Sequence, residues 1–413
     1  MALSSGQYTR GWGRPASQRA RRQGQAGVVH RCAAYSGTSP PSAHRRQLLA
    51  GGALLVGLGA AHSPPCVAAA ASTVFHEVAV PLPIAGDDGV PLREPPTRVK
   101  ATGRIVAIGD LHGDLDKTLA SLRLARVVEG GEGGAPLRWA GGDATVVQLG
   151  DVLDRGNVEI GIIKLLMDLD DQARREGGAV YMLNGNHESL NVCGDFRYVT
   201  PGAFIESAVE FGLPRDVALR NWDGCIQARA ALFLPGGRAA RMLSRNPTVL
   251  VVNDTAFAHG GLLPVHVAYG IERMNAEVAA WMRRDRTPDG FASPPFLAMG
   301  DGKSVMWNRQ LSVEKWNNPI DRFHAAAQVG QALREIGAKR LVVGHTPQMR
   351  GANAELDGMV WRIDVGMSSG VLDAPVAVLE ITRSPGGGDD VVRIVSEGLG
   401  MGSLDEPEGL LDV

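Results

Sequence analysis

The chain has 413 residues, of which 44% are hydrophobic and 21% charged, so it can bury a full core without disulfides or a structural metal. Its four cysteines form no CxxC motif and no Cys/His cluster, which speaks against a zinc finger and against a disulfide framework. The net charge of −2 combines an arginine-rich leader with a remainder of 34 basic and 44 acidic residues, which offers no basic surface to a nucleic acid.

The first 75 residues have the composition of a targeting segment. Residues 1–47 are rich in Arg, Ser, Ala and Gly and contain no acidic residue, which is typical of an organellar transit peptide. Arg45-Arg46 then precede an apolar run, Leu48 to Ala61, that is too short to span a membrane, and small residues follow it. This order is typical of a second, export signal. We expect residues 1–75 to be removed, leaving no stable membrane span in a chloroplast protein whose further destination would be the thylakoid lumen. A disordered leader followed by a membrane anchor is the alternative.

The pattern after Arg98 predicts strands that alternate with helices. Buried strands are predicted at 104–108, 145–149 and 179–183 because these short apolar runs contain β-branched residues. A helix is predicted to start near Asp116, and a second helix is predicted over 160–173. Such alternation indicates an α/β (α+β layered) fold.

Residues 189–247 interrupt this alternation with Gly and Pro and show no long helical period. We expect them to form an inserted cap region that contains short helices at 204–211 and 228–233. Asn253-Asp254 predicts the turn of a hairpin that follows the cap. The remaining predictions are strands at 248–252 and 255–258, a helix at 265–284, a loop at 285–304, a helix at 325–336 and strands at 340–343, 359–364, 376–381 and 391–395. The catalytic domain is expected to span 98–396, with a loose acidic tail at 397–413.

Five of the predicted strands end in glycine beside a polar residue. The segments are Gly109-Asp110-Leu111-His112-Gly113-Asp114, Gly150-Asp151-Val152-Leu153-Asp154-Arg155-Gly156, Gly185-Asn186-His187-Glu188, His259-Gly260-Gly261 and Gly344-His345-Thr346. In open α/β sheets, ligands bind beyond the carboxyl ends of the strands, and glycine lets the backbone turn tightly there. We therefore expect these polar side chains to converge on one site.

The donor types predict two divalent metal ions. Asp110 and His112 are two residues apart on a segment expected to be extended, so both side chains would leave the same face toward one ion. Asp151 could bridge to a second ion, because a carboxylate has two oxygens to share. Oxygen and imidazole donors without a thiolate favour Mn, Fe or Zn over copper or an iron–sulfur cluster. Each motif taken singly is also compatible with an ordinary turn or ion pair, so the ordered set carries the prediction.

The motifs GDLHGD, GDVLDRG, GNHE, HGG and GHT occur in this order and resemble the signatures of the phosphoprotein phosphatase family of metallophosphoesterases. The segments NVCGDFRYV (191–199), MWNR (306–309) and IDVG (363–366) are similar to the Shewanella-like phosphatases of plants and algae. The resemblance covers roughly residues 100–380. It implies a central β-sandwich flanked by helices.

The resemblance also implies a role for each site residue. Asp110, His112 and Asp151 would hold the first metal, and Asp151, Asn186, His259 and His345 would hold the second. Arg155, Asn186 and Arg309 would bind phosphate oxygens, and so would Arg197 by resemblance to the subfamily. His187 would protonate the leaving group, oriented by Asp154.

These observations predict a metal-dependent phosphoprotein phosphatase that hydrolyses phosphate monoesters with a water activated by two metal ions. Its partner would be a phosphorylated protein substrate. The Ser-Ala-Pro-Asn-Tyr loop of the eukaryotic enzymes is missing, so the regulatory subunits are unknown. One alternative is a diadenosine-polyphosphate hydrolase of the same fold, whose second motif usually lacks the Asp found here at Asp154. Another is an inactive binding module. Cys193 and Cys225 could pair in an oxidising compartment or remain reduced thiols.

Overall fold

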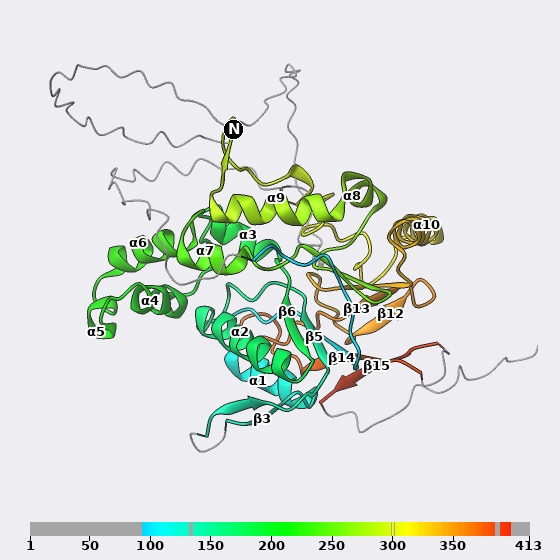
Figure 1. The fold of residues 1–413 in the computed structure, drawn as a ribbon, viewed down its shortest axis with the longest axis horizontal. Coiled ribbons are helices and arrows are strands. Elements are labelled where there is room, and N and C mark those ends of the chain that lie inside the picture. The colour runs from blue at the N-terminus through cyan, green and yellow to red at the C-terminus, as the bar shows by residue number, and fades with distance from the viewer. Residues whose placement is uncertain (1–92, 132–134, 299, 301, 385–388, 398–413) are drawn as a thin grey trace, which may run out of the picture. The chain divides into compact units, whose positions relative to one another are not determined.

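The computed structural model describes residues 93–131, 135–298, 300, 302–384 and 389–397 (Figure 1). The predicted targeting segment 1–75 and the predicted tail beyond Glu397 lie outside the described residues. The chain divides into two units, and every described residue belongs to the second, His62–Val413. None of the described helices combines the length and the apolar character needed to cross a membrane.

Two mixed β-sheets form the centre of this unit. The five-stranded sheet has the order β15 (Val391–Ser396), β14 (Ala377–Thr382), β2 (Ile105–Ile108), β5 (Thr145–Gln148) and β6 (Ala179–Met182). The six-stranded sheet has the order β1 (Arg98–Val99), β7 (Val249–Val252), β8 (Thr255–Ala258), β11 (Arg340–Val343), β13 (Val360–Arg362) and β12 (Asn353–Glu355). Every predicted strand is present, including the hairpin of β7 and β8.

Parallel strand direction places the carboxyl ends of the motif-bearing strands at the same edge of each sheet. In the five-stranded sheet β2, β5 and β6 are parallel, and in the six-stranded sheet β8, β11 and β13 are parallel. The loops that leave these strands therefore emerge at one edge of each sheet. These are the loops that carry the Gly-flanked polar motifs.

The two sheets pack face to face as a β-sandwich. Ile105 and Ala107 of β2 lie in one buried cluster with Phe257 of β8 and Val342 of β11, so this cluster fills the space between the sheets. The alternate residues of the same strands point outward. Because side chains alternate across a strand and both faces are buried, the strands read as continuous apolar runs.

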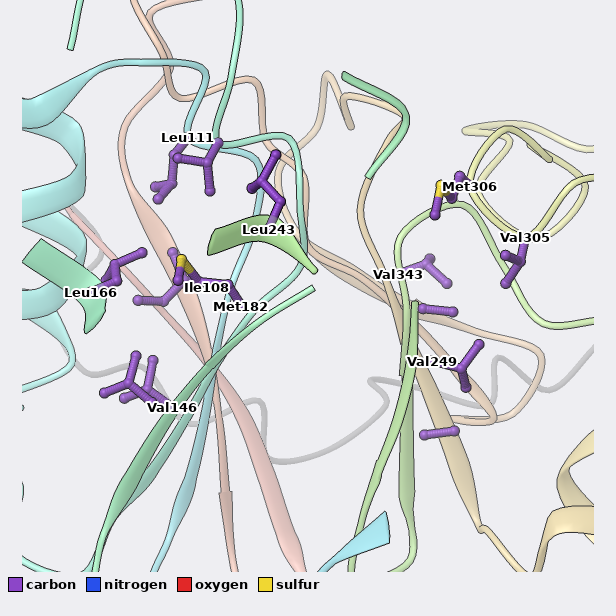
Figure 2. Packing of buried hydrophobic residues seen from close by; sticks show 14 of the residues in the cluster. Ile108, Leu111, Val146, Leu166, Met182, Leu243, Val249, Val305, Met306 and Val343 are labelled. Carbon is purple, nitrogen blue, oxygen red and sulfur yellow. The ribbon is translucent and has the colours of Figure 1, made fainter. Parts of the chain in front are cut away.

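Helices cover the outward faces of the sheets. Figure 2 shows Ile108, Val146 and Met182 beside Leu166 of α2 (Ile160–Arg175), and Val249 and Val343 near Met306. These residues belong to one large buried cluster, to which α1 (Leu115–Leu124), α9 (Ile271–Arg283) and α10 (Pro319–Ile336) also contribute. The predicted sandwich flanked by helices is confirmed.

Residues 189–247 are more regular than the sequence suggested. The structure has five helices in and beside this region, namely α3 (Asn186–Val192), α4 (Pro201–Glu210), α5 (Arg215–Ala218), α6 (Trp222–Phe233) and α7 (Arg238–Leu243). Each is too short to show a long helical period, and side-chain caps set the starts of α4 and α6. The Thr200 hydroxyl accepts from the Ala203 amide, and the Asn221 side chain accepts from the Gly224 amide. The helices α4 to α6 enclose a small apolar cluster of their own that contains Phe204 and Cys225.

Several other boundaries differ from the prediction. The helix expected at 265–284 is divided into α8 (Pro264–Tyr269) and α9 by Gly270, whose φ of 100° cannot continue a helix. The helix α10 begins earlier than predicted because Asn318 caps it by accepting from the Asp321 amide. The expected loop at 285–304 contains β9 (Arg286–Thr287), β10 (Gly290–Phe291) and the 3-10 turn η1 (Phe296–Ala298). The short hairpin of β3 (Val128–Gly130) and β4 (Leu137–Trp139) was not predicted.

Neither of the two described cysteines is part of a disulfide. Cys193 follows α3 and is exposed, whereas Cys225 is buried in α6, where its thiol donates to the Ala218 carbonyl. In this conformation the two residues are separate thiols.

Candidate active site

The polar residues that follow the parallel strands meet at one edge of the sandwich. Asp110 follows β2, Asp151 follows β5, Asn186 follows β6, His259 follows β8 and His345 follows β11, and all five side chains are buried. Two groups place their ligand atoms within 4.8 Å of one another. One group is Asp151 with His112 and His187, and the other is Asp151 with His259 and His345. Asp151 is shared between the groups, which is the position a bridging ligand requires.

The ring of His259 is held so that one nitrogen faces the carboxylate. Its Nδ1 lies 2.8 Å from the Leu149 carbonyl, which can only accept, so Nδ1 donates. Its Nε2 then faces Asp151 Oδ2 at 3.1 Å and Asn186 Oδ1 at 3.0 Å. Nε2 of the neutral ring, the carboxylate oxygen and the amide oxygen are all acceptors, so a proton or a metal ion must lie between them. Orientation of a histidine by a backbone carbonyl is also the usual arrangement behind a metal ligand.

The other two histidines are oriented in the same way. His112 Nδ1 donates to the Leu153 carbonyl at 2.9 Å, leaving Nε2 3.9 Å from Asp151 Oδ2. His345 Nε2 lies 3.1 Å from the Trp307 carbonyl and donates to it, leaving Nδ1 for the site. Burial lowers the pKa of His112 to about 3, so this ring is neutral and has a free electron pair for a ligand.

The carboxylates are packed without enough positive charge to balance them. Asp364, which follows β13, lies against Asp110, and burial together with their mutual repulsion raises the pKa of Asp110. Burial raises the pKa of Asp364 to about 6. Burial alone would lower the pKa of His259, but Asp151 and Asp110 raise it to about 10. Both effects indicate a site that attracts cations, and buried oxygen and imidazole donors fit divalent metal ions.

The backbone at the site is held in a sparsely populated conformation. Of the eleven non-glycine residues with positive φ in the described part of the chain, five are predicted site residues: His112, Asp151, Asp154, Arg155 and His345. Such strain persists only where surrounding contacts enforce it, and it often marks functional sites. The expected extended segment from Asp110 to His112 is therefore wrong, since His112 has a φ of 45°. The glycines have a steric role as well, because a Cβ on Gly344 would collide with the Asp110 carboxylate.

Glu188 fixes the loops that carry these residues. Its buried carboxylate accepts from the amides of Asp151 at 2.8 Å, Val152 at 2.9 Å, Leu153 at 3.2 Å and Gly185 at 2.7 Å. The sequence alone gives no role to Glu188 or Asp364, although both lie in motifs that carry the family resemblance.

His187 and Asp154 form a buried pair next to the shared carboxylate. His187 Nδ1 lies 2.5 Å from Asp154 Oδ2, and the His187 amide donates to Asp151 Oδ1 at 2.9 Å. Burial alone would lower the pKa of His187, but the two carboxylates raise it. The ring is thus fixed in orientation and biased toward its protonated form.

Three arginines surround the opening of the site. A cavity of about 160 Å³ is lined by Arg155, Arg197 and Arg309 together with several site residues, namely His112, Asp151, Asn186, His187 and His345. Arg309 Nη1 donates to the His345 carbonyl and to Thr346 Oγ1, both at 2.9 Å. The guanidinium groups of Arg155 and Arg197 flank the ring of Tyr198, at 5.6 Å and 5.9 Å from its centre. All three predicted phosphate-binding arginines are therefore brought to one cavity.

The sequence matches the profile of calcineurin-like phosphoesterases over residues 103–349, which covers more than half of the chain and every motif except the loop at Asp364. The chain belongs to this family. It is 39% identical to Shewanella-like protein phosphatase 2 of Arabidopsis thaliana over 73% of the chain and 79% of that protein. It is 31% identical to Shewanella-like protein phosphatase 1 of Plasmodium berghei over 65% of the chain and 68% of that protein.

A solved structure has a similar fold. The fold resembles that of the cold-active protein-tyrosine phosphatase of a psychrophilic Shewanella species, with a TM-score of 0.51 and 21% identity. The match covers 73% of this chain and 82% of that one. The family, the fold and the hydrolase class predicted from the sequence are confirmed, and the chain is a metallophosphoesterase of the Shewanella-like group.

The shared carboxylate provides a direct test of the metal site. We expect Asp151→Asn to lose at least one metal and nearly all hydrolysis, because an amide cannot bridge two cations as a carboxylate does. Elemental analysis of the purified variant and its turnover of nitrophenyl phosphate measure the two effects.

Asp168→Asn is the matched control, because Asp168 is exposed on α2 and its carboxylate accepts a hydrogen bond from Gln172, away from the site. This variant should keep both metal content and turnover. An Asp151→Asn protein with two bound metals and normal turnover would contradict the assignment of Asp151 as a bridge.

Proposed function

We propose that this metallophosphoesterase is a protein phosphatase that removes phosphate from phosphorylated side chains. The observation that carries the proposal is the buried pair of His187 and Asp154, held beside the carboxylate shared by the two groups of metal-ligating residues. A general acid in this position serves a substrate whose leaving group is a poor one, such as the alkoxide of a side chain. The names of the relatives in Arabidopsis and Plasmodium support the same activity.

The metal ligands would divide as the resemblance implies. Asp110, His112 and Asp151 would hold one ion, and Asp151, Asn186, His259 and His345 would hold the other. When bound, two divalent ions, Mn, Fe or Zn, would supply an activated water and Lewis-acid stabilisation of the charge on the phosphate.

The remaining steps belong to the residues around the cavity. Arg155 and Arg309 would bind phosphate oxygens, since a guanidinium fork matches their geometry. Arg197 would add a third contact, although it already pairs with Asp195. His187, with Nδ1 held by Asp154, would transfer a proton from Nε2 to the departing oxygen.

A diadenosine-polyphosphate hydrolase remains the competing activity. It differs in the leaving group, because a departing nucleotide phosphate is a weak base that needs little protonation. A buried acid held by Asp154 favours the phosphatase.

A substrate panel separates the two activities. We expect the mature chain, here residues 76–413, to hydrolyse phosphopeptides containing phosphoserine, phosphothreonine or phosphotyrosine much faster than diadenosine tetraphosphate. Inorganic phosphate released from the phosphopeptides and mononucleotides released from diadenosine tetraphosphate, measured at equal substrate concentrations, decide between them. Preferential cleavage of the dinucleotide would refute the proposal, and the Asp151→Asn protein sets the background of contaminating activity.

The role of His187 has a distinct kinetic signature. We expect His187→Asn to lower turnover of phenyl phosphate by roughly 10²–10⁴, with a much smaller loss for nitrophenyl phosphate, whose leaving group needs little protonation. His324→Asn, an exposed histidine on α10, should leave both rates unchanged. An equal loss on both esters would show that His187 does not act as an acid.

The location of the protein is a separate proposal that rests on the leader alone. We propose import into the chloroplast, with the lumen as the further destination. Sequencing the terminus of the mature protein from isolated thylakoids tests this. A terminus near Ala71 supports the lumen, and a terminus before Arg45 excludes it.

A further inference from the structure

A buried arginine from one of the inserted helices lies close to the pair of His187 and Asp154. Arg229 of α6 has no exposed surface. Its guanidinium lies over the ring of Phe233 at 4.4 Å. Its Nη1 donates to Glu159 Oε2 at 2.6 Å and to Ser207 Oγ at 3.1 Å. A cation enclosed this completely is held by its hydrogen bonds and its carboxylate partner rather than by water.

Two short paths connect Arg229 to the Asp154 carboxylate. Arg229 donates from Nε and Nη2 to Asn191 Oδ1, at 3.1 Å and 2.7 Å, and Asn191 Nδ2 donates to Asp154 Oδ1 at 3.0 Å. On the other path, Glu159 Oε1 accepts from the Asp154 amide at 2.6 Å while Oε2 is paired with Arg229. Arg229 Nη2 itself lies 3.9 Å from Asp154 Oδ1.

These contacts determine which way the Asp154 carboxylate faces. The oxygen that Asn191 binds is turned toward the inserted helices, so the second oxygen is left for His187 Nδ1. Asp154 has a φ of 69°, a conformation that a residue without glycine's freedom keeps only when its neighbours enforce it. The hydrogen bond that the Asp154 amide donates to Glu159 restrains the backbone. The hydrogen bond that Asn191 donates to the Asp154 carboxylate restrains the side chain.

We propose that Arg229 is a positioning residue for the general acid. Through Asn191 and Glu159 it fixes Asp154, and Asp154 in turn fixes the ring of His187. The inserted helices are then part of the catalytic apparatus, because one of them provides the buried cation on which this chain of contacts depends. This inference rests on the role of His187 given under the proposed function.

A purely structural role makes a different prediction from a positioning role. If Arg229 only stabilises the fold, its replacement lowers the amount of folded enzyme and affects every substrate equally. If it positions the acid, the loss depends on the leaving group and disappears when the acid is already absent.

Two variants test this in the full mature enzyme. Arg229→Lys keeps a cation for Glu159 but cannot donate twice to Asn191, because an ammonium lacks the planar fork. Asn191→Leu keeps the pair of Arg229 and Glu159 and removes the link to Asp154, together with the bonds that Arg229 donates to Asn191 and that Asn191 donates to the His187 carbonyl. We expect each to lower turnover of phenyl phosphate by about 10- to 100-fold, with a loss on nitrophenyl phosphate several times smaller, since a displaced acid loses part of its contribution. Metal content, measured on the same samples, should be unchanged.

The same two changes are then made in the His187→Asn background. There we expect less than about twofold further loss on either ester, because no acid remains to be positioned. Arg340→Lys is the matched control. Arg340 is a buried arginine paired with Asp390 at the opposite end of β11 from His345, and its replacement should not alter the ratio of the two rates.

The outcomes distinguish the positioning role of Arg229 from the acid role of His187 on which it rests. Equal losses on both esters, or losses that persist fully without His187, would overturn the positioning role of Arg229. Less than about twofold loss in both variants would overturn it as well. If His187→Asn itself shows no dependence on the leaving group, the proposed acid fails first, and the inference about Arg229 fails with it.

Discussion

The Glu188 carboxylate is the contact on which the rest of the site depends. It accepts hydrogen bonds from four backbone amides, three in the loop after β5 and one in the loop after β6. Removing a buried acceptor that satisfies several donors leaves each of those donors unpaired, which is more costly than losing a hydrogen bond in water. This one side chain therefore determines where Asp151 stands relative to Asn186 and His187. Asp151, which belongs to both groups of candidate metal ligands, lies on one of the two loops that Glu188 holds together.

The loops of the site have backbone conformations that an unfolded chain would rarely adopt. Positive φ at Asp151, Asp154 and Arg155 bends one loop through a path that costs free energy at each residue, of the order of 1–3 kcal/mol. Burial of apolar side chains in the sandwich offsets this cost, because the core is continuous and the strands are buried on both faces. A rigid support is what lets several polar groups remain close together in the absence of solvent.

The strand ends of the site could be predicted because glycine and a polar residue follow each apolar run. The pattern marks Asp110, Asp151 and His345 without any knowledge of the fold. Asp364 was not singled out, although a strand was predicted at 359–364, because no glycine lies directly beside it and Gly366 stands two positions later. Arg229 escaped for a different reason, since nothing in an alanine-rich helical segment indicates that one arginine is buried against an aromatic ring. Tertiary contacts of this kind have no local signal, whereas the caps that start α4 and α6, Thr200 before Pro201 and Asn221, are local signals that the helices predicted at 204–211 and 228–233 did not include.

The ligands of the proposed metal site are spread from Asp110 to His345, across both sheets of the sandwich. No local segment can assemble them, so the unfolded chain has no comparable site and binds the ions weakly. By linkage, ions that bind only the folded state add RT ln(1 + [L]/Kd) to its stability, about 2.7 kcal/mol when their free concentration is 100 times Kd. The supply of metal in the compartment would then govern how much of the phosphatase persists as folded protein, as well as how much of it is active.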